Sequence, residues 1–306
     1  MVHELRQFLE DFGEGTSWGV LDEAGLMELH GQGLEEIEAV SADEVFTPRG
    51  EGVAPSNPAN VFSDLGQWCL KVLLSHRLPP ALQIVARGLR VGRPIRNASE
   101  LARVAGVSGP VAWRTVSALQ QEGLLSHPEP LRPLQTDVLM ARWRAASLRG
   151  GLDIRTRWLF PSRLGSLERL SSAIRAVDAA REGDPRRALG LFAAAEVLGQ
   201  GFVEGVAPFL LHEDPQAGEL ERLGLMVAGV GERVDVFVRR PRFASSVFRG
   251  ATVVDGVPVA DALQIWLDVS HHPARGAEMA EYLARGVLAE IVTSGEVGLL
   301  SDEDEP

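Results

Sequence analysis

Residues 95–125 carry the pattern that most restricts what this chain can fold into. Ser99 is a favourable N-cap, and the helix that it would begin ends at Gly106, whose backbone can take conformations that strain other residues. Ser108 is placed to cap a second helix, which Pro110 can enter because no N–H donor is needed in the first turn. The segment therefore predicts two helices joined by a short turn.

The second helix is predicted to have one packed face and one free face. Ala112, Val116 and Leu119 follow helical spacing and would pack against the first helix. The opposite face carries groups that can reach base edges and phosphates if the helix lies in the major groove of DNA, and Arg114 is the leading candidate for a base contact. The predicted base-contacting residues are Ser108, Pro110, Trp113, Arg114, Ser117 and Gln121.

The residues after the second helix complete the pattern. Gly123 ends the helix, residues 124–126 are predicted to start a strand, and residues 127–133 are predicted to form a wing turn. This order is typical of a winged helix-turn-helix module, although a helical hairpin buried in a larger fold fits the same spacing. The predicted phosphate-contacting residues are Arg96, Arg103 and Arg132.

The positive charge of the chain is concentrated around these two helices. The whole chain has 30 Lys and Arg against 42 Asp and Glu, for a formal net charge of −12, which by itself argues against nucleic-acid binding. Residues 1–70 hold 2 basic and 14 acidic residues, residues 71–163 hold 15 and 5, and residues 164–306 hold 13 and 23. The positive excess therefore lies where it would neutralise DNA phosphates.

Length and composition predict a globular cytoplasmic protein of two or three domains. A chain of 306 residues with 45% hydrophobic residues can bury a sizeable core. It has neither an apolar run long enough to cross a membrane nor an export signal at its start. Cys69 is the single cysteine and lies in an apolar run, which favours a buried structural thiol over a nucleophile.

The predicted fold class is α+β. We expect a small acidic N-terminal α/β element over residues 1–53, a winged helix-turn-helix DNA-binding domain over residues 54–150, and a C-terminal α/β domain over residues 151–306 for dimerisation or partner contact.

Several local elements are predicted within these domains. A small β-meander is expected over residues 18–40, and residues 77–94 are expected to form a loop insertion. In the last domain we expect a helix over residues 187–199, two strands joined by a tight turn over residues 224–239, and a long last helix over residues 276–292.

A resemblance to a known family is carried by VFSDLGQWCLKVLL, by IRNASELARVAGVS ending in QQEGLL, by TDVLMARWRA, and by VADALQIWLDV followed by AEYLARGVL. Together they resemble the winged-helix transcriptional regulators allied to the AbiEi-type antitoxins of type IV toxin–antitoxin systems. The resemblance implies a winged helix that binds promoter DNA, a C-terminal domain for dimer or partner contacts, and an adjacent toxin-like nucleotidyltransferase. Some relatives carry a nuclease-like domain ahead of the winged helix, but residues 1–53 are too few for such a core.

Enzymatic alternatives rest on weaker patterns. Residues 212–214 and 268–272 contain histidines and acids, but their spacings match no zinc signature. Asp261 and Asp268 share a helix face and could hold magnesium, yet Asp261 as an N-cap and Asp268 at the helix surface is the simpler interpretation. No glycine-rich phosphate loop is present. The chain is therefore predicted not to be an enzyme and to need no cofactor or metal.

The sequence thus predicts a sequence-specific, double-stranded DNA-binding transcriptional regulator that acts as a homodimer, because one winged helix buries too little surface for tight specific binding. Two alternatives stay open. One is an antitoxin-like interaction module that neutralises a nucleotidyltransferase-type toxin partner. The other is a metal-dependent nuclease or nucleotidyltransferase whose activity would require Asp261 and Asp268.

Overall fold

The structure, a computed structural model, divides into two compact units, Met1–Ser56 and Asn57–Pro306. It describes residues 18–21, 27–30, 61–127, 129–147, 152–178, 183–203 and 205–292. In the first unit, strands β1 (Trp18–Leu21) and β2 (Met27–His30) pair antiparallel, with Trp18 opposite His30. This pair confirms two strands of the expected meander, whose remainder lies outside the described residues.

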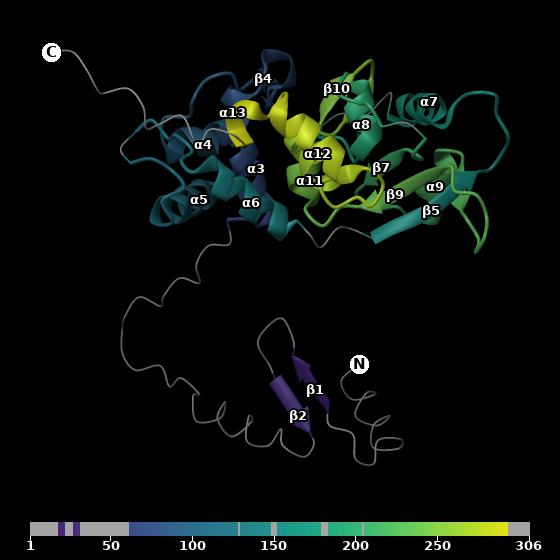
Figure 1. Ribbon diagram of the computed structural model, residues 1–306, viewed down its shortest axis with the longest axis horizontal. Coiled ribbons are helices and arrows are strands. Elements are labelled where there is room, and N and C mark those ends of the chain that lie inside the picture. The colour runs from purple at the N-terminus through teal and green to yellow at the C-terminus, as the bar shows by residue number, and fades with distance from the viewer. Residues whose placement is uncertain are drawn as a thin grey trace. The chain divides into compact units, whose positions relative to one another are not determined.

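The second unit combines helices with a mixed sheet, so the fold class is α+β. Figure 1 shows α11 and α12 between the helices α3 to α6 and the sheet. The helices are α3 (Asp64–Leu74), α4 (Ala98–Ala105), α5 (Gly109–Gln121), α6 (Thr136–Ala146), α7 (Ser166–Asp178), α8 (Leu191–Val197), α9 (Ala217–Arg222), α10 (Ala244–Gly250), α11 (Ala262–Val269), α12 (Gly276–Arg285) and α13 (Ala289–Val292), with short 3-10 turns at Ser75–Arg77 and Pro80–Leu82.

Helix α3 is the centre of the helical part. Its first turn is capped by Ser63, whose Oγ accepts a hydrogen bond from the Gly66 N–H at 3.3 Å. The helix packs against α4, α5 and α10, and almost all of its side chains are buried. Trp68 is buried there and donates its indole N–H to the carbonyl of Ala105 at the end of α4, at 2.7 Å. Helix α4, and with it α5, is therefore held on α3.

A β-hairpin lies where a loop insertion was expected, so that prediction was wrong. Strands β3 (Val85–Ala86) and β4 (Leu89–Arg90) pair antiparallel across a two-residue turn. Arg87 and Gly88 in this turn both have positive φ, 51° and 77°, a geometry that matches the twist of paired strands. Strands of two residues are too short to give an alternating pattern that sequence analysis can detect.

The segment after α5 folds back on itself as expected, but with less regular pairing. The Ser126 N–H donates to the carbonyl of Arg132 at 2.9 Å, and Leu125 and Pro133 form an isolated bridge. The Leu131 N–H donates to the carbonyl of Ile95 at 2.9 Å, which joins this segment to the residues ahead of α4. The strand predicted from residue 124 is thus reduced to a bridge.

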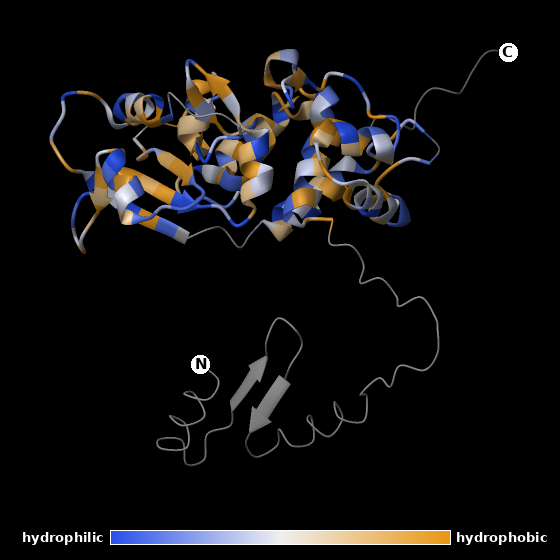
Figure 2. Ribbon diagram, turned by 180° about the vertical axis from the view of Figure 1, so that it is seen from behind, coloured by the Kyte–Doolittle hydropathy of each residue, from blue (hydrophilic) through white to orange (hydrophobic). Residues whose placement is uncertain are grey.

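The C-terminal part is built on a seven-stranded sheet of described strands, in the order β10-β11-β6-β7-β9-β5-β8. The strands are β5 (Leu152–Trp158), β6 (Arg187–Gly190), β7 (Phe209–His212), β8 (Leu225–Val227), β9 (Val236–Arg240), β10 (Thr252–Val254) and β11 (Val257–Val259). The pairs β6–β11 and β7–β9 are parallel, and the other pairs are antiparallel. All residues of β6 and β7 are buried, and strands of the sheet carry the hydrophobic colour in Figure 2.

Three predictions for this part were wrong in their pairing or bounds. The expected helix over residues 187–199 is strand β6 followed by α8, because a short buried apolar run reads alike as helix or strand. Strands β8 and β9 form no hairpin, since β5 lies between them. The expected long last helix breaks after Arg285 into α12 and α13, where Gly286 leaves the helical conformation.

The helical part and the sheet part share one hydrophobic core. Buried residues from α3 to α6 and from the sheet and its helices belong to a single continuous cluster. Lys71 of α3 is fully buried, and its ammonium contacts Asp261 Oδ2 at 2.8 Å, the Ser246 carbonyl at 3.0 Å and Gln264 Oε1 at 3.0 Å. The parts that the sequence assigns to residues 54–150 and 151–306 are therefore joined by a buried ion pair.

Candidate functional site

Helices α4 and α5 meet in a turn whose geometry follows from local capping. The N-cap of α4 is Asn97, whose Oδ1 accepts the Glu100 N–H at 3.0 Å; the prediction of Ser99 was wrong, because Asn97 already has the extended backbone of a cap. Gly106 ends α4 in the left-handed conformation at φ 63°. Ser108 occupies the N-cap position of α5, but its side chain makes no capping hydrogen bond.

Helix α5 is divided into a packed face and a free face. Ala112, Val116 and Leu119 are buried, as the spacing predicted, and α5 packs on both α4 and α3. Of the predicted base-contacting residues, Ser117 is half-buried and the other members are exposed: Ser108, Pro110, Trp113, Arg114 and Gln121. Trp113 has 63% of its surface exposed, although large aromatic side chains usually contribute to a core.

Arg114 and Trp113 lie side by side in sequence on this free face. Within the described part of the chain, no hydrogen bond or ion pair engages the guanidinium of Arg114 or the indole N–H of Trp113. A guanidinium offers five N–H donors in a planar fork, and this arrangement matches guanine edges and phosphate oxygens. The face is chemically able to bind an acceptor-rich partner.

The predicted phosphate-contacting arginines differ in their surroundings. Arg96 and Arg132 are exposed, and no ion pair to a described residue engages either guanidinium. Arg103 is also exposed, but its guanidinium lies 3.4 Å from Glu100 Oε1, to which Arg93 is also paired. Burial opposes ionisation of Glu100, yet the hydrogen bond from the Arg96 N–H and the two arginines hold the pKa of Glu100 below its usual range. Arg103 is thus partly neutralised in place.

The end and the beginning of α5 are each anchored by arginines. Arg142 of α6 pairs with Glu122 just after α5, at 2.7 Å. At the other end, Arg249 of α10 donates to the carbonyl of Gly106 at 3.3 Å. These contacts fix α5 relative to α6 and α10, so that its free face is presented on a rigid support.

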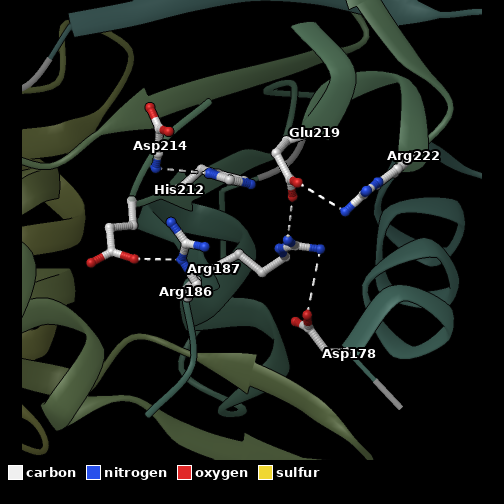
Figure 3. A network of polar contacts seen from close by, with 8 residues as sticks. Asp178, Arg186, Arg187, His212, Asp214, Glu219 and Arg222 are labelled. Carbon is white, nitrogen blue, oxygen red and sulfur yellow. Dashed lines mark hydrogen bonds and ion pairs between the residues drawn. The ribbon is translucent and has the colours of Figure 1, made fainter. Parts of the chain in front are cut away.

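A second polar cluster surrounds the segment 212–214 that the sequence singled out (Figure 3). Arg187 on β6 is buried and contacts Glu219 at 2.9 Å and Asp178 at 3.4 Å. His212 at the end of β7 is buried, and its Nδ1 accepts the Asp214 N–H at 3.1 Å. Burial, and then the charge of Arg187, lower the pKa of His212 to about 4, so its ring is neutral near pH 7.

Sequence analysis missed Arg187 and Glu219 as members of this cluster. Arg187 lies in a segment that was assigned to a helix, and Glu219 lies on α9, so only the strand pairing of β6 with β7 brings them together. Among the residues that the structure describes, no three His, Cys, Asp or Glu side chains come together as ligands for a metal ion. The cluster is an ion network in which a buried arginine is paired with two carboxylates.

Asp261 and Asp268 have different partners. Asp261 caps α11 as predicted, accepting the Gln264 N–H at 3.0 Å, and its second oxygen contacts the buried ammonium of Lys71. Asp268 lies 4.0 Å from Arg239 and is largely enclosed rather than at the helix surface; burial raises the pKa of Asp268 above its usual range. A magnesium ion bridging both carboxylates would have to displace Lys71 from Asp261.

Comparison with known proteins identifies no relative: no protein family, no curated protein and no solved structure matches this chain. The resemblance to the AbiEi-allied regulators therefore stays a prediction from the sequence. In the part of the chain that the structure describes, no helix is both long enough and apolar enough to cross a membrane.

Proposed function

We propose that the chain binds double-stranded DNA in a sequence-specific way and regulates transcription, with α4 and α5 as the helix-turn-helix of a winged helix. The observation that carries this proposal is the free face of α5, where Trp113 and Arg114 are exposed without a described partner. An exposed helix with an unpaired guanidinium has the form and chemistry that major-groove reading requires.

The surroundings of α5 support the same function. The residues flanking the helix are rich in arginine, while the rest of the chain is acidic. Arg96 lies ahead of α4, and Arg132 lies in the folded-back segment that takes the place of a wing. Arginines around α5 attract phosphates, so that DNA approaches the second unit from the side of α5.

Homodimerisation is part of the proposal, since a single winged helix buries too little surface for tight specific binding. Two copies would place two α5 helices in successive major grooves, about 34–36 Å apart. The mass of the complex, measured by light scattering, should then correspond to two chains on one duplex.

The proposal is tested by selection from a library of random duplexes with the full chain, followed by fluorescence anisotropy on the enriched duplex. We expect an enriched motif that binds at least about a thousandfold more tightly than a shuffled duplex at the same salt concentration. Enrichment of no motif, or equal affinity for enriched and shuffled duplexes, would contradict sequence-specific binding.

A second candidate function is an antitoxin-like role in which the same face binds a protein. The exposed Trp113 favours it, since tryptophan is enriched at the centre of protein interfaces. Under this alternative, a neighbouring nucleotidyltransferase-type protein co-purifies with the chain, Trp113→Ala abolishes the complex, and the selection yields no DNA motif.

A further inference from the structure

The β3–β4 hairpin and α4 enclose a groove of about 460 Å³, of which only Arg103 has been given a role so far, as a predicted phosphate contact. Four arginines line it: Arg87, Arg90, Arg93 and Arg103. The other lining residues are all aliphatic, among them Leu89, Val91 and Val104. No carboxylate contributes to this lining among the described residues.

The charge of the groove is unbalanced. Glu100 lies behind Arg93 and Arg103 and offsets part of their charge, and Arg90 donates to the carbonyl of Pro80. Even with Glu100 counted, four guanidiniums face one carboxylate. Two of them, Arg93 and Arg103, have 63% and 65% of their side-chain surface exposed, so their remaining N–H donors are open to a ligand.

The aliphatic part of the lining favours a ligand that carries an apolar group as well as a negative charge. Leu89 has 71% of its surface exposed beside the arginines, so an apolar group that packs on it would remove apolar surface from water. The volume falls in the usual range of small-molecule sites, about 300–1,000 Å³, whereas inorganic phosphate would leave most of it unfilled.

We propose that this groove binds a small organic anion with an apolar body, such as an aromatic carboxylate or an alkyl phosphate. The carboxylate or phosphate is held by the arginines, which accommodate planar and tetrahedral oxyanions in bidentate fashion. The apolar body packs on Leu89 and Val104 and removes their exposed surface from water.

The groove lies next to the turn between α4 and α5, so a bound ligand would contact residues beside that turn. The side chain of Arg87 lies against Gly106, where its Cδ is 3.4 Å from the place a Cβ would take. Arg103 and Val104 belong to the last turn of α4, directly ahead of the turn into α5. A ligand that engages these residues contacts the turn that sets the position of α5. This consequence, unlike the binding itself, rests on the proposed DNA function.

The test is calorimetric titration of the full chain, without DNA, with 2-naphthoate and hexyl phosphate. Their comparisons are the neutral 2-naphthamide and inorganic phosphate. We expect saturable binding of at least one amphipathic anion below about 1 mM, with the neutral or the purely inorganic comparison about tenfold weaker or more. Titration without DNA keeps the outcome independent of whether α5 reads a sequence.

Variants locate the site. Arg87→Gln should weaken binding of the amphipathic anion about tenfold through loss of charge, and Leu89→Ser should weaken it through loss of apolar cover. Both positions are exposed, so folding should not be affected. Arg144→Gln removes an exposed arginine of α6 outside the groove and should leave the affinity within twofold.

Three results would overturn the proposal. The first is failure of both amphipathic anions to saturate the protein. The second is equal binding by wild type and Arg87→Gln, which would place the ligand elsewhere. The third is inorganic phosphate binding as tightly as hexyl phosphate, which would mean that the groove takes phosphate groups alone, as a contact to a nucleic-acid backbone does.

Discussion

At the residue scale, Cys69 and His212 are among the titratable side chains that folding removes from water, and the burial of each has a measurable consequence. Cys69 is completely buried, and burial raises the pKa of its thiol to about 11, which removes the thiolate that thiol reagents require.

We predict that Cys69 in the native protein reacts with a disulfide reagent such as DTNB at least a hundredfold more slowly than in denaturant at pH 8. Because Cys69 is the single cysteine, the absorbance of the released thiolate measures this residue alone. A native rate close to the denatured rate would mean that the helix around Cys69 opens freely.

His212 should make stability depend on pH. Its folded pKa, about 4, is below the value of 6.5 expected in the unfolded chain. As the pH falls from 7 toward 4, His212 becomes protonated in the unfolded chain but stays largely neutral in the folded protein. The free energy of unfolding therefore falls across this window, by on the order of 3 kcal/mol from His212 alone.

The measurement is urea unfolding of wild type and His212→Gln at several pH values from 7.5 to 4. Other groups titrate in both proteins, so the difference between the two curves isolates His212. The account predicts that wild type loses more stability than the variant as the pH falls. If the free energies of unfolding of wild type and His212→Gln fell in parallel with pH, the ring of His212 would not be held neutral by the fold.

At the scale of elements, α3 holds the helices and the sheet together through Lys71. Its ammonium has three acceptors, one of them the carboxylate of Asp261, and both side chains are buried. Removing one partner of such a pair leaves the other charge buried without compensation, which costs about 3–5 kcal/mol.

We therefore predict that Lys71→Met lowers the free energy of unfolding by about 3–5 kcal/mol, and that Lys71→Met combined with Asp261→Asn loses less than the sum of these two single changes. Asparagine retains the acceptor that caps α11. Urea denaturation of the three variants gives the coupling energy. Strict additivity would mean that Lys71 and Asp261 do not interact.

The sequence locates the elements whose signals are local. The turn between α4 and α5 follows from Gly106 and Ser108, and the apolar stripe of α5 follows from helical spacing. The order of the sheet depends on contacts between distant segments, so the insertion of β5 between β8 and β9 leaves no local trace.

The same limit applies to the candidate sites. The free face of α5 could be predicted because exposure on a helix follows from periodicity. The groove beside β3 and β4 could not be predicted, since three of its four arginines, Arg87, Arg90 and Arg93, occupy a segment with the composition of a loop. The burial of Lys71 could not be predicted either. Lysine is almost never fully buried without a partner, and the partner of Lys71 is distant in sequence.

At the scale of the whole molecule, a positive region carried by an acidic protein predicts strong dependence of DNA binding on salt. Arg132 is exposed in the segment that folds back after α5, and under the proposed function its guanidinium contacts phosphate rather than bases.

We predict that Arg132→Ala weakens binding to enriched and shuffled duplexes alike and reduces the slope of log K against log salt by about 1. Anisotropy titrations at four salt concentrations measure the slope. A loss confined to the enriched duplex would instead assign Arg132 to base reading.

We propose that the free face of α5 reads base sequence, and the substitution Arg114→Ala tests this reading. The measurement is anisotropy on the enriched duplex and on duplexes substituted at each position, with Arg144→Ala of α6 as the matched loss of one exposed arginine. The account predicts that Arg114→Ala costs about 1–3 kcal/mol and relaxes preference at one or two base pairs, while Arg144→Ala keeps the full preference. Wild-type affinity and wild-type preference in Arg114→Ala would contradict it.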